Sequence, residues 1–402
     1  IIFRMYPALF GAAVQWDGIQ VDGQPADYLL TGTESVLHIP LKTSLKPGEA
    51  VMISISFAYQ MPDDGSANYN IFASSDNLLT LAHFYPMLAV FDEDGWHEEI
   101  PTIIGDVTHS DAAFYLVRII APENAVLVTS GHSLESKIVD GMQQEVFATG
   151  PARDFFICAG YDLVEDSTQV AGITVRSFTP AKLADGRKAA LSAAAAAIRT
   201  FSELLGPYPY REFDVIATNT NALGVEYPGL TTINQQLYYP DEKPDEGIPN
   251  NILLESVIAH ETAHQWLYNK IGNDQVNEPW MDESLTQYAT YRYYVDQYGS
   301  QAAKGYLQDF YSRWDRVNRA NIPIGKPVEY YADGSYSAIV YGRGAIFFYE
   351  LEQKYGISMM DDFFHDYVKK YSWDLVSSQE MKDSLEAACQ CDLNQLFMDW
   401  VE

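Results

Sequence analysis

Cysteine is scarce in this chain, which has three cysteines in 402 residues. So few cysteines exclude the disulfide framework of a small secreted domain. Cys389 and Cys391 form one C-x-C pair, but a zinc site built on cysteine needs a second pair, and the sequence has none. We therefore expect ordinary thiols at Cys158, Cys389 and Cys391, which leaves the redox compartment of the protein open.

Basic residues are also few, with 25 Lys and Arg against 55 Asp and Glu and a net charge of −30. Phosphate groups repel so acidic a chain, which excludes nucleic acid and anionic membrane surfaces as partners. The sequence lacks the run of about 18 apolar residues that a membrane-spanning helix requires, so we expect no transmembrane segment. The low lysine content and a first residue other than Met favour the cell envelope or the extracellular space.

Hydrophobic residues make up 47% of the sequence, and this share, with the chain length, predicts two or three globular domains. Residues 1–178 have the pattern of a β-rich domain. Residues 51–59 alternate between apolar and polar as a half-buried strand does, and residues 114–120 and 125–128 are further strand candidates. Turn-forming Gly, Pro and Asp separate these segments.

Helical patterns replace the strands in the second part of the chain. An alanine-rich helix is predicted over 181–205. Residues 213–217 and 230–233 are strand candidates, and almost everything from residue 250 onward has helical periodicity. We place the domain boundary just before the alanine-rich helix and expect an α+β, mostly helical second domain over 179–402.

The pattern H-E-x-x-H occurs at His260-Glu261-Thr262-Ala263-His264, within a segment of helical apolar periodicity. Residues four apart share one face of an α-helix, so His260 and His264 can present two imidazole nitrogens to one metal ion. Glu261 is placed beside them to handle a proton. The alternative is a core helix with two incidental histidines, which is the weaker explanation because the chain has only eight histidines.

A catalytic zinc site needs a third protein ligand and an open position for water. Glu283 follows His264 after 18 intervening residues. The gap suits a helix that ends near residues 270–272, a reversal, and a second helix that begins near Pro279. Two packed helices would bring the Glu283 carboxylate beside the histidines. The alternative is a surface-helix glutamate, and the position relative to the motif argues against it.

H-E-x-x-H followed after 18 residues by Glu is the signature of the gluzincin metallopeptidases related to aminopeptidase N and leukotriene hydrolase. The chain resembles this family, and its bacterial members in particular, over nearly its whole length. Residues 224–228 are similar to the family's G-x-M-E-N segment, with Val225 in place of the usual Met. Residues 336–344 resemble the segment with the catalytic tyrosine, and residues 83–96 resemble the first domain of bacterial members. The chain ends where the family's catalytic domain ends, so we expect it to lack the domains that usually follow.

The resemblance implies a fold and a set of roles. The fold is an N-terminal antiparallel β-sheet domain, saddle- or sandwich-like, followed by a thermolysin-like α+β, mostly helical catalytic domain. One Zn²⁺ per chain is implied, held by His260, His264 and Glu283 with water in the fourth position. Glu261 is implied as general base and then general acid, and Tyr341 as a hydrogen-bond donor to the oxyanion.

The resemblance also implies the substrate. Glu226 would pair with the free α-ammonium group of a peptide, with Gly224 and Val225 beside it along the substrate, which implies a zinc aminopeptidase acting on peptides with a free N-terminus. Two alternatives stay open: a zinc hydrolase of internal peptide bonds, esters or epoxides, and a binding module with a structural zinc. A base and a tyrosine beside three ligands argue against the binding module, because structural zinc sites prefer four closed protein ligands.

Overall fold

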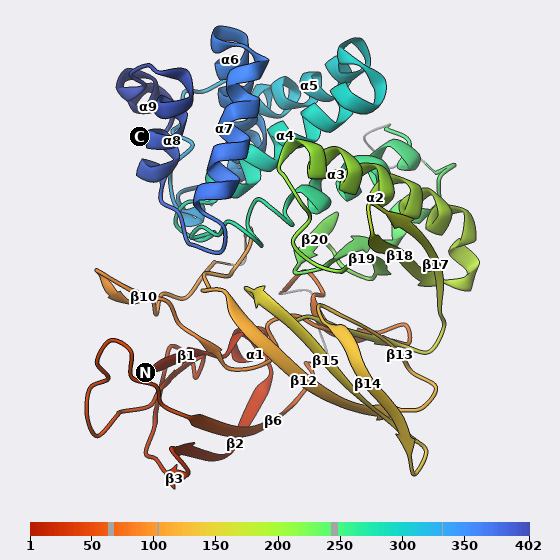
Figure 1. Cartoon of the computed structure of the whole chain (residues 1–402), viewed down its shortest axis with the longest axis vertical. Coiled ribbons are helices and arrows are strands. Elements are labelled where there is room, and N and C mark those ends of the chain that lie inside the picture. Colours follow the sequence, from red (N-terminus) through yellow and green to blue (C-terminus); the bar gives the residue numbers. More distant parts are fainter. Residues whose placement is uncertain (63–67, 103, 243–247, 332) are drawn as a thin grey trace.

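The computed structural model describes residues 1–62, 68–102, 104–242, 248–331 and 333–402. Strands make up the N-terminal part and helices most of the C-terminal part, and the two parts lie against each other (Figure 1). The N-terminus lies among the strands and the C-terminus among the helices. The predicted order, a β-rich part followed by an α+β part that becomes helical, is confirmed.

Small antiparallel sheets build the N-terminal part. The described residues form sheets in the orders β4-β5-β1-β9, β3-β2-β6, β13-β16-β8-β7, β12-β15-β14 and β10-β11. The short helix α1 (Tyr6–Leu9) follows the first strand. The strand bounds are β1 (Ile2–Arg4), β2 (Ala13–Val21), β3 (Gln24–Pro25), β4 (Leu29–Thr31), β5 (Val36–His38), β6 (Ile53–Gln60), β7 (Phe72–Ser75), β8 (Leu78–Leu81), β9 (Met87–Leu88), β10 (Phe91–Asp92), β11 (Gly95–Trp96), β12 (Ala113–Pro122), β13 (Val126–Thr129), β14 (His132–Val139), β15 (Met142–Ala152) and β16 (Ile157–Gly160).

The predicted strands of this part are present close to their predicted positions. The segment predicted over 51–59 forms β6, whose side chains alternate between half-buried and exposed because one face of its sheet covers a small core. The segments predicted over 114–120 and 125–128 lie in β12 and β13.

A five-stranded sheet opens the C-terminal part, in the order β17-β18-β19-β21-β20. The bounds are β17 (Leu163–Val170), β18 (Ile173–Pro180), β19 (Glu212–Thr218), β20 (Gly224–Tyr227) and β21 (Leu230–Asn234). The three central strands run parallel, and β17 and β20 are antiparallel edge strands. The boundary placed between residues 178 and 179 falls inside β18, because β17 and β18 pair with each other and continue the sheet of the second part.

The strands β19 and β21 of this sheet are buried on both faces. Val215 on β19 belongs to the large core that the sheet forms with the helices, whereas the next residue, Ile216, belongs to a core shared with the N-terminal part. The stacked rings of Phe156 and Tyr227, with centroids 4.2 Å apart, lie in this second core. Successive side chains of a strand point to opposite faces of the sheet. One face of this sheet therefore packs on the helices and the other on the N-terminal part.

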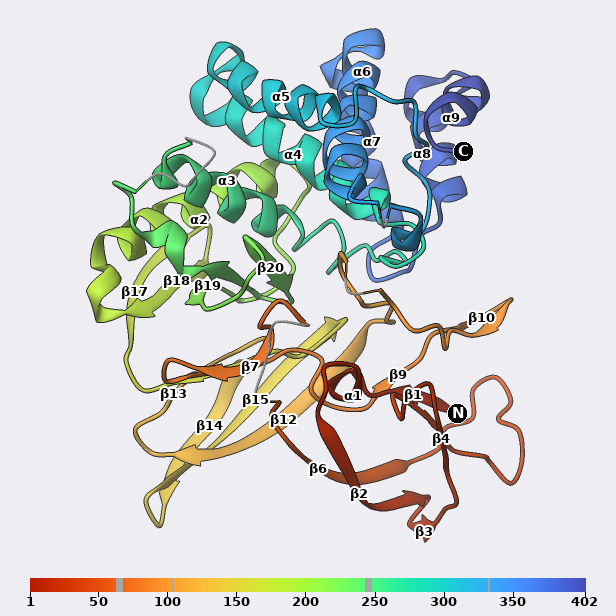
Figure 2. The same ribbon diagram turned by 180° about the vertical axis from the view of Figure 1, so that it is seen from behind.

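Helices cover the side of the sheet that faces away from the N-terminal part (Figures 1 and 2). The alanine-rich segment forms α2 as predicted, and a capping box between Ser377 and Glu380 begins α8. The helical bounds are η2 (Ala181–Leu183), α2 (Ala184–Leu204), η3 (Gln235–Tyr238), α3 (Asn250–Ala263), α4 (Trp280–Tyr298), α5 (Ser300–Asp315), η4 (Val328–Tyr331), η5 (Ser337–Arg343), α6 (Gly344–Tyr355), α7 (Ile357–Lys370), α8 (Ser378–Cys389) and α9 (Asn394–Trp400). None of the helices in the described ranges is long and apolar enough to cross a membrane.

Arg153 joins the two parts of the chain at a single buried point. Its guanidinium donates hydrogen bonds to the backbone carbonyls of Ser110, Tyr268 and Asp374, at 2.9, 2.8 and 2.7 Å. These carbonyls come from a loop of the N-terminal part, the segment after α3, and the segment before α8. One side chain thus ties three distant segments together.

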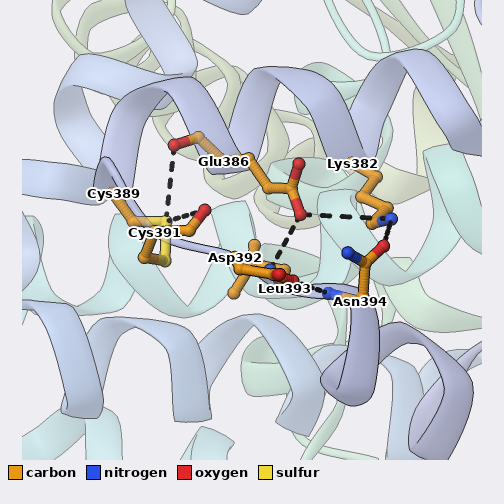
Figure 3. Close-up of a disulfide and its surroundings, with 7 residues drawn as sticks. All are labelled: Lys382, Glu386, Cys389, Cys391, Asp392, Leu393 and Asn394. Atoms are coloured by element: carbon orange, nitrogen blue, oxygen red, sulfur yellow. Dashed lines mark hydrogen bonds and ion pairs between the residues drawn. A yellow bond between two sulfur atoms is a disulfide. The ribbon is translucent and has the colours of Figure 1, made fainter.

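The prediction of ordinary thiols at all three cysteines is wrong for two of them. Cys389 and Cys391 form a disulfide at the end of α8 (Figure 3). The intervening Gln390 has a left-handed backbone (φ 50°), and the two Cα atoms lie 5.2 Å apart, within the range that a disulfide bridges. Cys158 is a free, buried thiol, as expected.

Candidate active site

The H-E-x-x-H segment lies at the C-terminal end of α3, and its last residue, His264, directly follows the helix. His260, Glu261 and His264 are all buried, at 8, 6 and 1% exposure. The helix predicted to continue to residues 270–272 ends at Ala263 instead, so that prediction is wrong. Beyond it the chain folds back in tight turns before α4 begins after Pro279, as predicted.

The early end of α3 has a consequence for His264. The backbone N–H of Ile271 bonds to the carbonyl of Trp266 rather than to that of Leu267, so the Leu267 carbonyl is free to accept from His264 Nδ1 at 2.9 Å. A carbonyl can only accept, so Nδ1 carries the proton in neutral His264 and Nε2 keeps its lone pair for a metal ion. By contrast, His260 Nδ1 is buried and has no hydrogen-bond partner within the described part of the chain.

Glu283, in the first turn of α4, completes the set of three predicted ligands. Its Oε2 lies 3.1 Å from His260 Nε2 and 3.4 Å from His264 Nε2, and the two Nε2 atoms are 3.2 Å apart. We call these three atoms the ligand triangle. The structure therefore brings together the residues that the spacing of the motif singled out.

The ligand triangle fits a zinc ion. The centre of a triangle with these sides lies about 1.9 Å from each corner (one side divided by √3), so an ion slightly off its plane reaches all three atoms at the ~2.0–2.2 Å typical of zinc. Two imidazoles and one carboxylate are also the donor set of catalytic zinc sites, which leave a fourth position for water. The residues present therefore fit the metal that the motif predicts.

Glu261 faces the edge strand β20. A Cβ built on Gly224 would lie 2.6 Å from Glu261 Oε1, so the strand backbone passes directly over this carboxyl group. A side chain at this position would displace Glu261 or the strand, which favours glycine here. Val225, the next residue of the predicted substrate segment, is half-buried, and its backbone carbonyl accepts from the Thr231 hydroxyl at 3.0 Å.

Glu226 projects from the same strand toward the ligand triangle. It is 7% exposed, and its Oε1 lies 4.0 Å from His264 Nδ1. Gln275, in the loop before α4, donates from Nε2 to Glu226 Oε1 at 3.2 Å and to Asp282 Oδ2 at 2.9 Å. The Gln275 amide therefore holds the Glu226 carboxyl in position.

Tyr341 lies in η5, a π-helical segment over Ser337–Arg343. Its hydroxyl donates to Glu283 Oε1 at 2.5 Å, which places it at the edge of the ligand triangle. The Ser284 hydroxyl donates to the Val340 carbonyl at 2.6 Å and so fastens this segment to α4. Short π-helical turns are frequent at functional sites, and this one positions the predicted tyrosine.

Buried acidic groups dominate the electrostatics of the site. Burial raises the pKa of Glu261, and Glu226 raises it further. Burial opposes the charged form of Glu283, but hydrogen bonds from His260 and His264 outweigh it and hold the Glu283 pKa well below its usual range. Burial likewise opposes a charged His264, whose pKa is nevertheless raised by Glu226 and Glu283. Such a concentration of carboxyl groups suits positively charged ligands.

Two residues of the site were missed by the sequence analysis. Asp106, in a loop of the N-terminal part, lines the same small cavity as Glu226, and burial raises its pKa, with Glu226 and Glu283 adding to the effect. Gln275 is the other. Neither residue belongs to a motif, and both come from irregular loops, so no local pattern in the sequence indicates them.

Comparisons with known proteins agree with this geometry. Residues 189–400 match the model of the peptidase family M1 domain. The chain is 24% identical over 307 residues to aminopeptidase M1 of Arabidopsis thaliana, covering 72% of this chain and 34% of that protein. It is 25% identical over 193 residues to leukotriene A-4 hydrolase of Xenopus laevis, covering 46% and 30%. This chain therefore spans about a third of the length of these two relatives.

The fold also has a counterpart among solved structures. The crystal structure of an M1 zinc metallopeptidase from Deinococcus radiodurans matches with a TM-score of 0.74 at 20% identity, covering 100% of this chain and 86% of that one. At this identity the match establishes a common fold, an N-terminal antiparallel β-sheet part followed by a mostly helical part.

Proposed function

Because this chain belongs to peptidase family M1, we propose that it is a zinc-dependent aminopeptidase, which hydrolyses the peptide bond after the amino-terminal residue of a peptide. One arrangement carries the proposal: the ligand triangle of His260, His264 and Glu283, with Glu261 beside it and the buried Glu226 carboxyl on the neighbouring strand. The aminopeptidase among the relatives supports it.

The proposed chemistry needs a base next to the metal position. Zinc bound at the ligand triangle would lower the pKa of a water molecule and polarise the scissile carbonyl group. Glu261 would accept a proton from that water at a carboxylate oxygen and pass it to the leaving amine nitrogen, as general base and then general acid. Because Gly224 has no side chain, the Glu261 carboxyl fits closely against β20.

Tyr341 would stabilise the oxyanion that develops on the substrate carbonyl. Its hydroxyl donates to Glu283 Oε1, at the edge of the ligand triangle, which supports this role. Removing such a donor typically slows catalysis about 100- to 1000-fold, which is the loss we expect for Tyr341→Phe.

Glu226 would select substrates with a free amino terminus. It lies on β20, the last strand of its sheet among the described residues, so an extended peptide can lie along that edge. The substrate ammonium would then pair with the Glu226 carboxylate, which Gln275 orients. Peptides without a free amino terminus lack this contact.

Hydrolysis of a panel of aminoacyl amides by the zinc-loaded protein tests the proposal, with Glu261→Gln as the matched inactive variant. We expect turnover by the wild-type protein and loss of turnover in the variant and after chelation. A wild-type protein that binds zinc but hydrolyses none of these amides, nor any ester or epoxide, would instead be a binding module with a structural zinc.

Amino-terminal acetylation separates the aminopeptidase from other zinc hydrolases. We expect acetylated peptides to be cut far more slowly than free ones. Equal rates would contradict the role of Glu226 and favour an endopeptidase. Turnover of esters or epoxides without turnover of peptides would favour a non-peptide substrate, in line with the relative named leukotriene A-4 hydrolase.

A further inference from the structure

A second group of metal-binding side chains lies outside the candidate active site. Among the described residues, His97, Glu99, His109 and Asp274 each offer one ligand atom, and these atoms all lie within 4.8 Å of one another. His97 and Glu99 follow β11, His109 lies in the loop before β12, and Asp274 lies in the loop before α4. Two neighbouring segments of the N-terminal part thus meet a segment of the C-terminal part that is distant in the sequence.

The two imidazoles of this group are arranged like those of the ligand triangle. The ring centroids of His97 and His109 are 4.7 Å apart with the planes at 84°, and those of His260 and His264 are 4.7 Å apart at 87°. His109 Nδ1 lies 3.4 Å from Asp274 Oδ2 and is buried, with no hydrogen-bond partner among the residues that the structure describes. A buried imidazole nitrogen without a partner that faces a carboxylate is suited to bind a cation.

The two carboxylates of the group are held close together. The Asn277 side-chain amide donates to Glu99 Oε1 at 3.3 Å and to Asp274 Oδ2 at 2.7 Å. On the other side, His97 Nδ1 lies 3.4 Å from Glu99 Oε1. Two like charges brought together in this way repel each other unless a positive charge lies near both.

We propose that His97, Glu99, His109 and Asp274 bind a second divalent transition-metal ion, with Zn²⁺ as the expected occupant. Imidazoles combined with carboxylates suit zinc, whereas Ca²⁺ and Mg²⁺ prefer sets of oxygen ligands. Four protein ligands close the coordination sphere, so the site is structural. The Glu99 side chain is 40% exposed, so we expect weaker binding here than at the buried ligand triangle.

The second site is connected to the first through neighbouring residues. Thr108 precedes His109 and Gln275 follows Asp274, and Thr108 Oγ1 donates to Gln275 Oε1 at 2.7 Å. Gln275 in turn donates to Glu226 Oε1. An ion that joins His109 to Asp274 fixes both segments and thereby holds Gln275 against Glu226. The effect of the second metal site on Glu226 rests on the proposed function, whereas the metal site itself does not.

Zinc stoichiometry of the full chain tests the site. The protein is dialysed against buffered zinc and its metal content is measured by mass spectrometry. We expect two zinc ions per chain in the wild-type protein and one in His109→Ala. Glu99→Gln should retain the second ion with at least about tenfold weaker affinity. His264→Ala, which removes a corner of the ligand triangle, should lose the first ion and keep the second.

His132→Ala is the matched control, because His132 Nδ1 also lies near a carboxylate, 3.1 Å from Glu212 Oε1, but belongs to neither group. It should bind two ions. One ion in the wild-type protein, or two in a folded His109→Ala, would overturn the proposal. If circular dichroism shows that His109→Ala is unfolded, the zinc affinity of Glu99→Gln and His97→Gln is measured instead. An unchanged affinity for the second ion in both variants would overturn the proposal.

Kinetics of Glu99→Gln test the connection to Glu226. At a zinc concentration that fills the first site but leaves the weakened second site of this variant mostly empty, we expect KM for an aminoacyl amide to rise about fivefold while kcat is unchanged. An unchanged KM would overturn the connection. The stoichiometry does not depend on any activity, so failure of the proposed function and failure of the second site are distinguishable.

Discussion

At the scale of single residues, the backbone of Gly224 packs directly against the carboxyl group of Glu261, the proposed base. A Cβ at position 224 would lie 2.6 Å from Glu261 Oε1 and 2.7 Å from Val257 Cγ1. The main chain of β20 is therefore as near to α3 as a residue without a side chain permits. This contact sets the distance between the proposed base and the proposed substrate edge.

We expect Gly224→Ala to lower kcat about 100-fold, because a displacement of about 1 Å at a catalytic group has an effect of this size. Zinc content should stay unchanged, since the ligand triangle does not touch Gly224. Steady-state kinetics and metal analysis check this. Gly18→Ala is the control, because Gly18 also lies in a strand and a Cβ there meets no described atom within 4 Å. Equal kcat values in both variants would contradict the steric argument.

Cys158 should be inert in the folded protein, because burial raises the pKa of its thiol to about 12 and almost no thiolate is present at pH 8. Labelling with an alkylating reagent at pH 8 should modify no cysteine in the folded, non-reduced protein. It should modify one after unfolding and three after unfolding with a reductant, because Cys389 and Cys391 form a disulfide. Three modified cysteines without reductant would contradict the disulfide.

The residues of the ligand triangle were predictable because helix geometry fixes the relation between His260 and His264, and the spacing to Glu283 is specific. Glu226 and Tyr341 were identified only by resemblance to a family, since a single carboxylate or phenol has no distinctive pattern. Nothing in the sequence indicated Gln275, because its partner Glu226 is 49 residues away in a different element.

At the scale of elements, the π-helical segment η5 depends on its contact with α4. Gly344 ends this segment against Ser284, and a Cβ at position 344 would lie 2.7 Å from Ser284 Cβ and closer still to its hydroxyl oxygen. The Ser284 hydroxyl is the donor that fastens η5 through Val340. Glu283 and Tyr341 therefore occupy two elements joined at this contact.

Gly344→Ala should separate η5 from α4 and destabilise the protein by about 1 to 3 kcal/mol, the usual cost of overpacking a core. Activity should fall as well, because Tyr341 moves with η5. Urea denaturation followed by circular dichroism measures the free energy of unfolding. Gly305→Ala, in α5 with open space around it, is the control and should not destabilise. Equal stability of the two variants would argue against tight packing at position 344.

The end of α3 shows why element boundaries were harder to predict than element types. Apolar residues continue past the motif at Leu267 and Ile271, which favours a longer helix. The helix ends at Ala263, and the turns that follow leave the Leu267 carbonyl for His264 Nδ1. The hydrogen bond to His264 thus takes precedence over the helical periodicity of the sequence. An analysis of periodicity cannot detect this hydrogen bond.

At the scale of the whole molecule, Arg153 is one of the polar connections between the two parts. It is fully buried, and Gly272 packs against its guanidinium so closely that a Cβ there would lie 2.6 Å from one of its nitrogens. Its three acceptors are all backbone carbonyls. Without Arg153 these carbonyls would lose their charged donor in a site with little access for water.

Arg153→Met keeps most of the volume but removes every donor, so we expect the free energy of unfolding to fall by about 3 kcal/mol or more. Denaturant titration measures it. Arg319→Met is the control, because Arg319 pairs with Asp315 on the surface, where both side chains are about half exposed, and should show no measurable change. A loss that is no larger for Arg153→Met than for the control would contradict the role of Arg153.

The overall order of strands and helices was predictable from periodicity, but the assignment of strands to sheets was not. Alternation identifies a strand and its buried face, and it does not say which strands pair with it. The boundary at residue 178 therefore falls within β18, which pairs with β19 more than 30 residues later in the chain.

The double-sided burial of the five-stranded sheet limits how this protein can be divided. Expressing either part separately would expose an apolar surface, at Ile216 on one side or Phe156 on the other. Gene fusions and swaps between relatives should therefore keep the N-terminal part together with the five-stranded sheet, and a crossover placed inside β18 should lower the yield of soluble protein.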